Sequence, residues 1–148
     1  MNNKIPPPIV TLVSGLIIFF SRPLFPEYDS NLVNIFSTIL LFLGLLVFFL
    51  AVASFKKYKT TVNPLQPSNA SHLVISGIFC FTRNPMYLGM ALILLSLSFK
   101  FNLLGGILVT ALFIMFITRF QIIPEEDAML SLFQDEFKTY KENTRRWI

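Results

Sequence analysis

A short polar group, Thr-Arg-Asn-Pro-Met-Tyr at residues 82–87, stands directly before a long apolar run. Asn84 is a favourable N-cap and Pro85 a favourable first helical residue, so the group would start a helix. A helix N-terminus at a membrane surface also attracts an anionic group, and Arg83 adds a bidentate donor beside it. Tyr87, one turn later, fits an interfacial anchor as well. A plain helix start and an anion-binding site both account for these residues.

Two adjacent carboxylates, Glu125 and Glu126, follow Pro124 at the end of another apolar run. Neighbouring helical residues point in different directions, so one carboxylate is expected to face inward while the other meets water. Favourable charge at a helix start, or a solvated face, also explains them. Arg119 lies one to two turns earlier, near the hydrocarbon edge, where a charge either snorkels to the interface or has a function.

The composition is that of a membrane protein of one domain's length. Of the 148 residues, 54% are hydrophobic and only 14% are charged, which disfavours a soluble domain. The single cysteine excludes a disulfide framework, and the sequence has no phosphate loop, zinc signature or Ser-His-Asp arrangement. We therefore expect no metal. The apolar runs carry no acid in mid-span, which counts against a proton-coupled carrier.

Four apolar runs predict membrane-spanning helices over about residues 8–25, 32–55, 85–100 and 103–123. Apolar residues at helical spacing predict a cytoplasmic amphipathic helix over residues 125–142. Of the 12 Lys and Arg residues, all but Arg22 and Lys100 fall on one side of this arrangement. The positive-inside rule then places both termini and the connection between the second and third runs in the cytoplasm. We expect an all-α, multi-pass membrane protein with a single domain over residues 1–148, whose first run is retained and not cleaved as a signal.

The order of these motifs resembles the integral-membrane methyltransferases typified by isoprenylcysteine carboxyl methyltransferase, with phospholipid N-methyltransferases as more distant relatives. The similar segments are SHLVISGIFCFTRNPMYLG, a helical hairpin, and RFQIIPEEDAMLSLFQDEFKTYKENTRRWI. The resemblance implies a pocket for S-adenosylmethionine, released as S-adenosylhomocysteine, between the cytoplasmic loop, the third run and the tail. With Arg83 added from its place beside the helix start, the expected cofactor contacts are Ser71, His72, Leu73, Val74, Phe79, Arg83, Asn84, Pro85, Met86, Tyr87 and Glu125.

Three positions depart from the pattern of that family. The prototype has His where this chain has Asn84 and Tyr where it has Phe79. Its substrate-facing Arg aligns with Gln121, whereas Arg119 lies two residues earlier, on a different part of the helix surface. The expected catalytic group is therefore Arg119 or Gln121, to orient the substrate, together with Glu126.

The resemblance implies methyl transfer to a lipophilic acceptor at the cytoplasmic membrane interface. A carboxylate acceptor needs no general base, whereas an amine must first lose a proton, and His72, Glu126 and Asp127 are the few bases on offer. This scarcity favours a carboxylate, as in isoprenylcysteine-type O-methylation, over a lipid amine. The expected partners are membrane lipids and a lipophilic or lipidated substrate, not nucleic acid. A non-catalytic four-helix membrane protein, such as a small transporter or lipid-binding scaffold, and a family member without activity are the alternatives.

Overall fold

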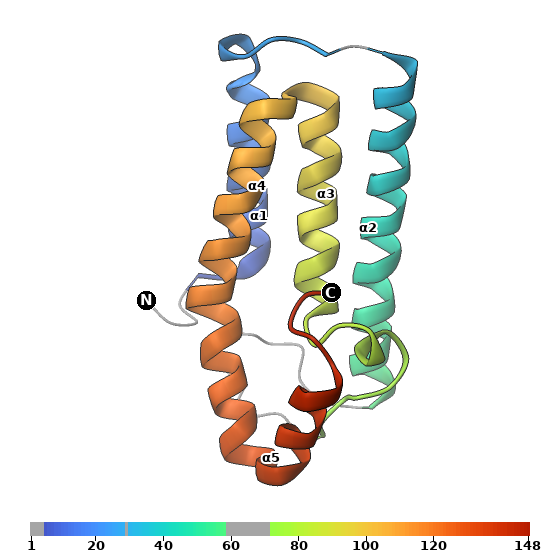
Figure 1. Cartoon of the computed structure of the whole chain (residues 1–148), viewed down its shortest axis with the longest axis vertical. Coiled ribbons are helices and arrows are strands. Elements are labelled where there is room, and N and C mark those ends of the chain that lie inside the picture. Colours follow the sequence, from blue (N-terminus) through green and yellow to red (C-terminus); the bar gives the residue numbers. More distant parts are fainter. Residues whose placement is uncertain (1–4, 29, 59–71) are drawn as a thin grey trace.

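The computed structural model describes residues 5–28, 30–58 and 72–148 (Figure 1). In these ranges the regular structure is helical: α1 (Pro7–Phe20), α2 (Asn31–Lys57), α3 (Pro85–Phe101), α4 (Leu103–Ile117) and α5 (Ile123–Asn143). Short 3₁₀ turns lie at Arg22–Leu24 and Gly77–Cys80, and a π-helical segment, Thr118–Ile122, joins α4 to α5. The predicted all-α class is confirmed. The first helix ends at Phe20, short of residue 25, because the chain turns at Ser21.

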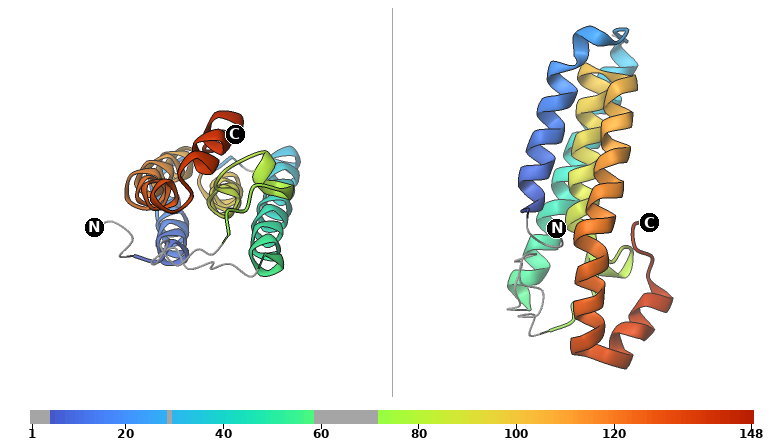
Figure 2. Two further views of the ribbon diagram at one scale, coloured as in Figure 1. Left: turned by 90° about the horizontal axis from the view of Figure 1, so that it is seen from below. Right: turned by 90° about the vertical axis from the view of Figure 1, so that its left-hand side faces the viewer.

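Helix α3 lies in the centre of the bundle formed by α1, α2, α3 and α4 (Figures 1 and 2). Its residues Met90 and Leu94 form the main core with Ile18 of α1 and with Phe113 and Ile117 of α4. All five are less than 5% exposed. Helices α1, α2 and α4 all pack on α3, and the polar group found in the sequence lies at the start of this helix.

Two glycines bring α2 and α3 into backbone contact. A Cβ atom on Gly89 would lie 2.7 Å from the Gly44 carbonyl oxygen, and one on Gly44 would lie 2.9 Å from the Gly89 oxygen. Any larger residue would force the helices apart, as at small-residue contacts between membrane helices. Further along the same contact, the Ser37 hydroxyl donates to the Ser96 carbonyl at 3.0 Å.

Asn102 alone separates α3 from α4 and makes their tight hairpin. Its side-chain oxygen accepts from the Gly105 N–H at 3.0 Å, which caps α4. Its side-chain nitrogen donates to the Ser21 hydroxyl at 3.0 Å, which ties the hairpin to the end of α1. One residue thus fixes the end of the bundle opposite the polar groups.

Two helical stretches, α2 and Leu103–Asn143, are long and apolar enough to cross a membrane. Helices α1 and α3 are also apolar, but their 14 and 17 residues fall short of the length of the other two. The outer faces of α1 and α2 expose large apolar side chains, among them Leu12 and Phe42. Such faces are suited to lipid and support association with a membrane.

The fourth run and the tail helix, predicted as separate over residues 103–123 and 125–142, continue into each other past Pro124, and the chain bends at Gln134 instead. Pro124 is the second residue of α5, and the wider turn of the preceding π-helical segment lets the helix continue past a residue that has no N–H. At Gln134 the backbone adopts φ 42° and ψ −113°. The second half of α5 therefore folds back toward the bundle (red in Figure 1), so the tail expected over residues 125–142 is a bent helix.

Candidate active site

The two polar groups that stand out in the sequence meet at one end of the bundle. The Tyr87 hydroxyl, in the first turn of α3, donates to Glu125 Oε1, in the first turn of α5, at 2.5 Å. Tyr87 is buried and Glu125 partly buried. Glu125 follows the apolar run of α4, and loss of hydration raises its pKa to about 8, although the hydrogen bond from Tyr87 opposes the shift. This carboxyl can therefore change charge near neutral pH.

The N-terminus of α3 is at Asn84, as predicted, but the Asn84 side chain does not cap it. Asn84 Nδ2 instead donates to the Arg146 carbonyl at 2.9 Å. The Leu88 N–H is the first in the helix that has a backbone acceptor, and it donates to the Asn84 carbonyl. Within the described ranges, the N–H groups of Met86 and Tyr87 are therefore left for another acceptor, as suits an anion.

Glu126 lies between two guanidinium groups. Arg83 Nη2 donates to Oε1 at 2.8 Å, and Arg146 donates through Nε to Oε1 at 3.0 Å and through Nη2 to Oε2 at 2.7 Å. Burial alone would raise the pKa of Glu126, but the hydrogen bonds from Arg146 and Arg83 outweigh it and hold the pKa below its usual range. A carboxylate in this setting is a poor proton acceptor, which disfavours the catalytic part expected of it.

The last residues of the chain pack against the start of α3. The Arg146 carbonyl accepts from Thr82 as well as from Asn84, and the Trp147 indole donates to Thr118 Oγ1 at 3.1 Å. Arg83 also donates to the Thr144 carbonyl. Sequence reasoning missed these contacts because the basic residues at the chain end served only to orient the chain in the membrane. The adjacent basic and aromatic residues at the chain end were the available signal.

The expected loop contacts pack against the end of α2. Val74 and Phe79 are buried beside Ala51, and the Phe79 ring meets Phe55 edge-on at 5.2 Å between centroids. The Tyr140 hydroxyl donates to the Phe79 carbonyl at 2.7 Å, which holds the returning half of α5 against the loop. Of the other expected contacts, Pro85 is buried, Leu73 and Met86 are half-buried, His72 is exposed, and Ser71 lies outside the described residues.

The two residues expected to orient the substrate both lie in the π-helical segment but differ in burial. Arg119 is exposed, whereas Gln121 is 1% exposed. Gln121 Nε2 donates to the Ile5 carbonyl at 2.6 Å, while its side-chain oxygen has no hydrogen-bond partner in the described structure. Within the described residues, no hydrogen bond joins either side chain to Tyr87 or Glu125, although π-helical segments often occur at functional sites.

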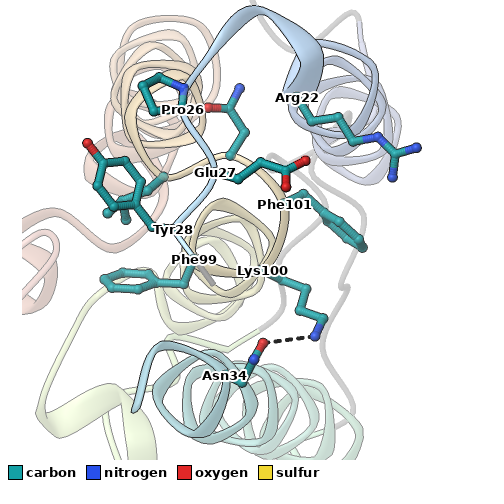
Figure 3. A pocket seen from close by; sticks show the side chains of 10 residues that line it. Arg22, Pro26, Glu27, Tyr28, Asn34, Phe99, Lys100 and Phe101 are labelled. Atoms are coloured by element: carbon teal, nitrogen blue, oxygen red, sulfur yellow. Dashed lines mark hydrogen bonds between the residues drawn. The ribbon is translucent and has the colours of Figure 1, made fainter. Parts of the chain in front are cut away.

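A separate cavity of about 190 Å³ lies at the opposite end of the bundle (Figure 3). Glu27, Tyr28 and Phe99 line it together with Lys100, whose ammonium donates to Asn34 Oδ1 at 2.9 Å. None of the expected site residues lines this cavity. It is therefore distinct from the Tyr87–Glu125 contact.

Comparison with known proteins places the chain in a family. A family model described as phospholipid methyltransferase matches residues 32–136, which cover all but the first residue of α2, the whole of α3 and α4, and the Glu125–Glu126 pair. The chain belongs to the phospholipid methyltransferase family. A protein of Haemophilus influenzae described as uncharacterized is 40% identical over 63 residues, which are 43% of this chain and 100% of that protein. No solved structure matches the chain.

Family membership supports methyltransferase activity on membrane lipid-type substrates and association with a membrane. It also agrees with the resemblance found from the motifs, since the matched range contains the polar group at the start of α3 and the two glutamates.

Proposed function

We propose that this protein transfers a methyl group from S-adenosylmethionine to the polar end of a membrane lipid. The observation that carries the proposal is the hydrogen bond between Tyr87 and Glu125, because it joins the starts of α3 and α5 into one site within a chain of this family. When bound, S-adenosylmethionine supplies an electrophilic methyl group on a sulfonium. The protein residues would bind the cofactor, orient the acceptor and exclude water.

The residues at the site fit the charged groups of this cofactor. The open N–H groups at the start of α3 suit a carboxylate, and Arg83 Nε, buried and without a partner among the described residues, offers a further donor. Glu125 suits an ammonium group or ribose hydroxyls. Tyr87 and Phe79 supply aromatic surface for a nucleoside or a sulfonium. The remaining contacts proposed for the pocket are His72, Leu73, Val74, Asn84, Pro85 and Met86, with Ser71 beyond the described residues.

The acceptor that we place first is a lipid amine, because the family match is to phospholipid methyltransferases. An amine must lose a proton to react, and Glu126, whose pKa is held low by Arg146 and Arg83, is a poor acceptor for that proton. A lipid carboxylate is the second candidate, since it needs no base. Arg119 or Gln121 would orient the polar head in either case, and Glu126 would hold the site together rather than accept a proton.

Four membrane spans with the site at the cytoplasmic face complete the proposal. Helices α1 and α3 run beside the two longer apolar stretches (Figure 1), and Arg22 and Lys100 lie at the end opposite Glu125. A lipid could then reach the site from the side of the bundle, with its tail along the exposed apolar faces.

Purified protein in native lipid, incubated with methyl-labelled S-adenosylmethionine, tests the proposal. We expect label in the lipid fraction: base-stable label indicates an amine and base-labile label an ester. Label should be lost with Glu125→Ala. Cofactor binding without turnover on a broad lipid panel would instead indicate a family member without activity. Cofactor-independent transport in liposomes, with neither binding nor label, would favour the non-catalytic alternative.

A further inference from the structure

The chain end forms a clasp over the start of α3 that no step of the proposed methyl transfer uses. We call residues 144–147 the C-terminal clasp. Its backbone contacts three consecutive residues: the Arg145 carbonyl accepts from the Arg83 N–H at 3.0 Å, and the Arg146 carbonyl accepts from Asn84 Nδ2 at 2.9 Å and Thr82 Oγ1 at 3.3 Å. The clasp therefore determines how the chain enters α3.

The clasp is itself fixed at two points. The Arg146 side chain makes a bidentate ion pair with Glu126, at 3.0 and 2.7 Å, and Glu126 is only 8% exposed. Trp147 donates to Thr118 and packs against the main core. Bidentate pairs between arginine and a carboxylate hold geometry as well as charge. Arg146 thus fixes the chain end to the first turn of α5.

The clasp has a consequence for the N-terminus of α3. Asparagine is among the best N-cap residues, because its side-chain oxygen accepts from the second or third N–H of the helix. Asn84 occupies the N-cap position, yet its side chain is turned to the Arg146 carbonyl. Beside it, the Arg83 side chain is only 9% exposed and has a buried Nε without a partner in the described ranges. Within the described structure, the first N–H groups of α3 therefore lack a side-chain cap, and Arg83, which donates to Glu126 and to the Thr144 carbonyl, keeps one donor unused.

We propose that the clasp, anchored by Arg146, holds Asn84 away from its capping position and so keeps the start of α3 open for the carboxylate of the bound cofactor. This inference rests on the proposed function. Without the Arg146 side chain, the clasp loses its ion pair with Glu126 and no longer holds the Arg146 carbonyl in place. The Asn84 side chain is then free to cap α3 and competes with that carboxylate for the same N–H groups. Arg146 is in this sense a positioning residue, which acts through Asn84 and Glu126.

Two ligands distinguish a positioning role of Arg146 in cofactor binding from a role in folding stability alone. S-adenosylhomocysteine carries the carboxylate and ammonium, whereas methylthioadenosine lacks both but keeps the adenosine and the sulfur. By calorimetry, Arg146→Ala should weaken binding of S-adenosylhomocysteine about 5- to 10-fold, the effect of one competing cap. It should leave methylthioadenosine binding within about 2-fold, and Arg146→Lys should recover part of the loss. The matched control is Lys138→Ala, which removes an exposed positive charge outside the clasp; both affinities should stay close to wild type.

A second pair of variants keeps the test decisive if Arg146→Ala does not fold. Asn84→Asp can cap α3 but cannot donate to the Arg146 carbonyl, whereas Asn84→Ala can do neither. Asn84→Asp should therefore lose more affinity for S-adenosylhomocysteine than Asn84→Ala. Equal losses in this pair, or an equal loss of both ligands in Arg146→Ala, would overturn the inference alone. Failure of the wild-type protein to bind either ligand would overturn the proposed function, and the inference with it.

Discussion

Two adjacent glutamates differ in charge behaviour because each meets different partners. Glu126 is held ionised by Arg83 and Arg146, while burial beside Tyr87 raises the pKa of Glu125 to about 8. Neighbouring carboxyls with pKa values moved apart are a common feature of functional sites. The sequence predicted that the two side chains would face different ways, since adjacent helical residues must. It did not predict the partners of Glu126, because Arg146 lies 20 residues later and returns only through the bend in α5.

The raised pKa of Glu125 predicts a pH dependence of cofactor binding. The pKa of Glu125 in the folded protein exceeds the ordinary carboxyl value of 4.5. Between about pH 4.5 and 8 the unfolded chain has therefore lost this proton while the folded protein keeps it, so the free energy of unfolding falls as the pH rises. A cofactor ammonium requires the ionised form, so affinity should rise with pH, about 20-fold between pH 6 and 7.5 by this titration. Calorimetry with S-adenosylhomocysteine measures the slope, and Glu125→Gln should abolish it. An unchanged slope in that variant would contradict the assignment.

At the scale of elements, the helices could be predicted closely, and the bend within α5 could not. The apolar runs locate α2, α3 and α4 because lipid and helix geometry leave little choice of length. Pro124 separates the predicted ranges 103–123 and 125–142, but the helix continues past it through the π-helical segment. The break at Gln134 carries no sequence signal, because a positive φ is the usual place for glycine or asparagine. The bend is nevertheless what brings Tyr140 and the clasp to the site.

The backbone conformation at Gln134 predicts that a substitution at this position stabilises the protein. Its φ of 42° and ψ of −113° are close to a turn conformation dominated by glycine, and a side chain there costs on the order of 1–3 kcal/mol. Gln134→Gly should therefore stabilise the protein by about 1 kcal/mol after the extra backbone entropy of glycine is counted. Thermal unfolding in detergent measures the gain. Gln134→Ala keeps the Cβ and should give little gain, so equal melting temperatures for the two variants would speak against strain at this position.

At the scale of the whole molecule, every part of the proposed site is positioned by packing on or near α3. The other helices of the bundle pack on it, the loop at its start packs on α2, and α5 with the clasp returns to its first turn (Figure 2). The resemblance to the membrane methyltransferases implied that the loop, α3 and the tail would converge. The closeness of the helices could not be predicted, since it depends on pairs such as Gly44 and Gly89, distant in the sequence.

Calorimetric binding of S-adenosylhomocysteine to the purified wild-type protein, with Glu125→Gln measured beside it, tests the central claim most directly. The account predicts saturable binding at one site per chain, weakened at least about 10-fold by Glu125→Gln, since a charged hydrogen-bonding group is lost. The exposed Glu136→Gln serves as the control and should bind like wild type. No measurable heat of binding to the wild-type protein, or equal affinity for Glu125→Gln, would contradict the account.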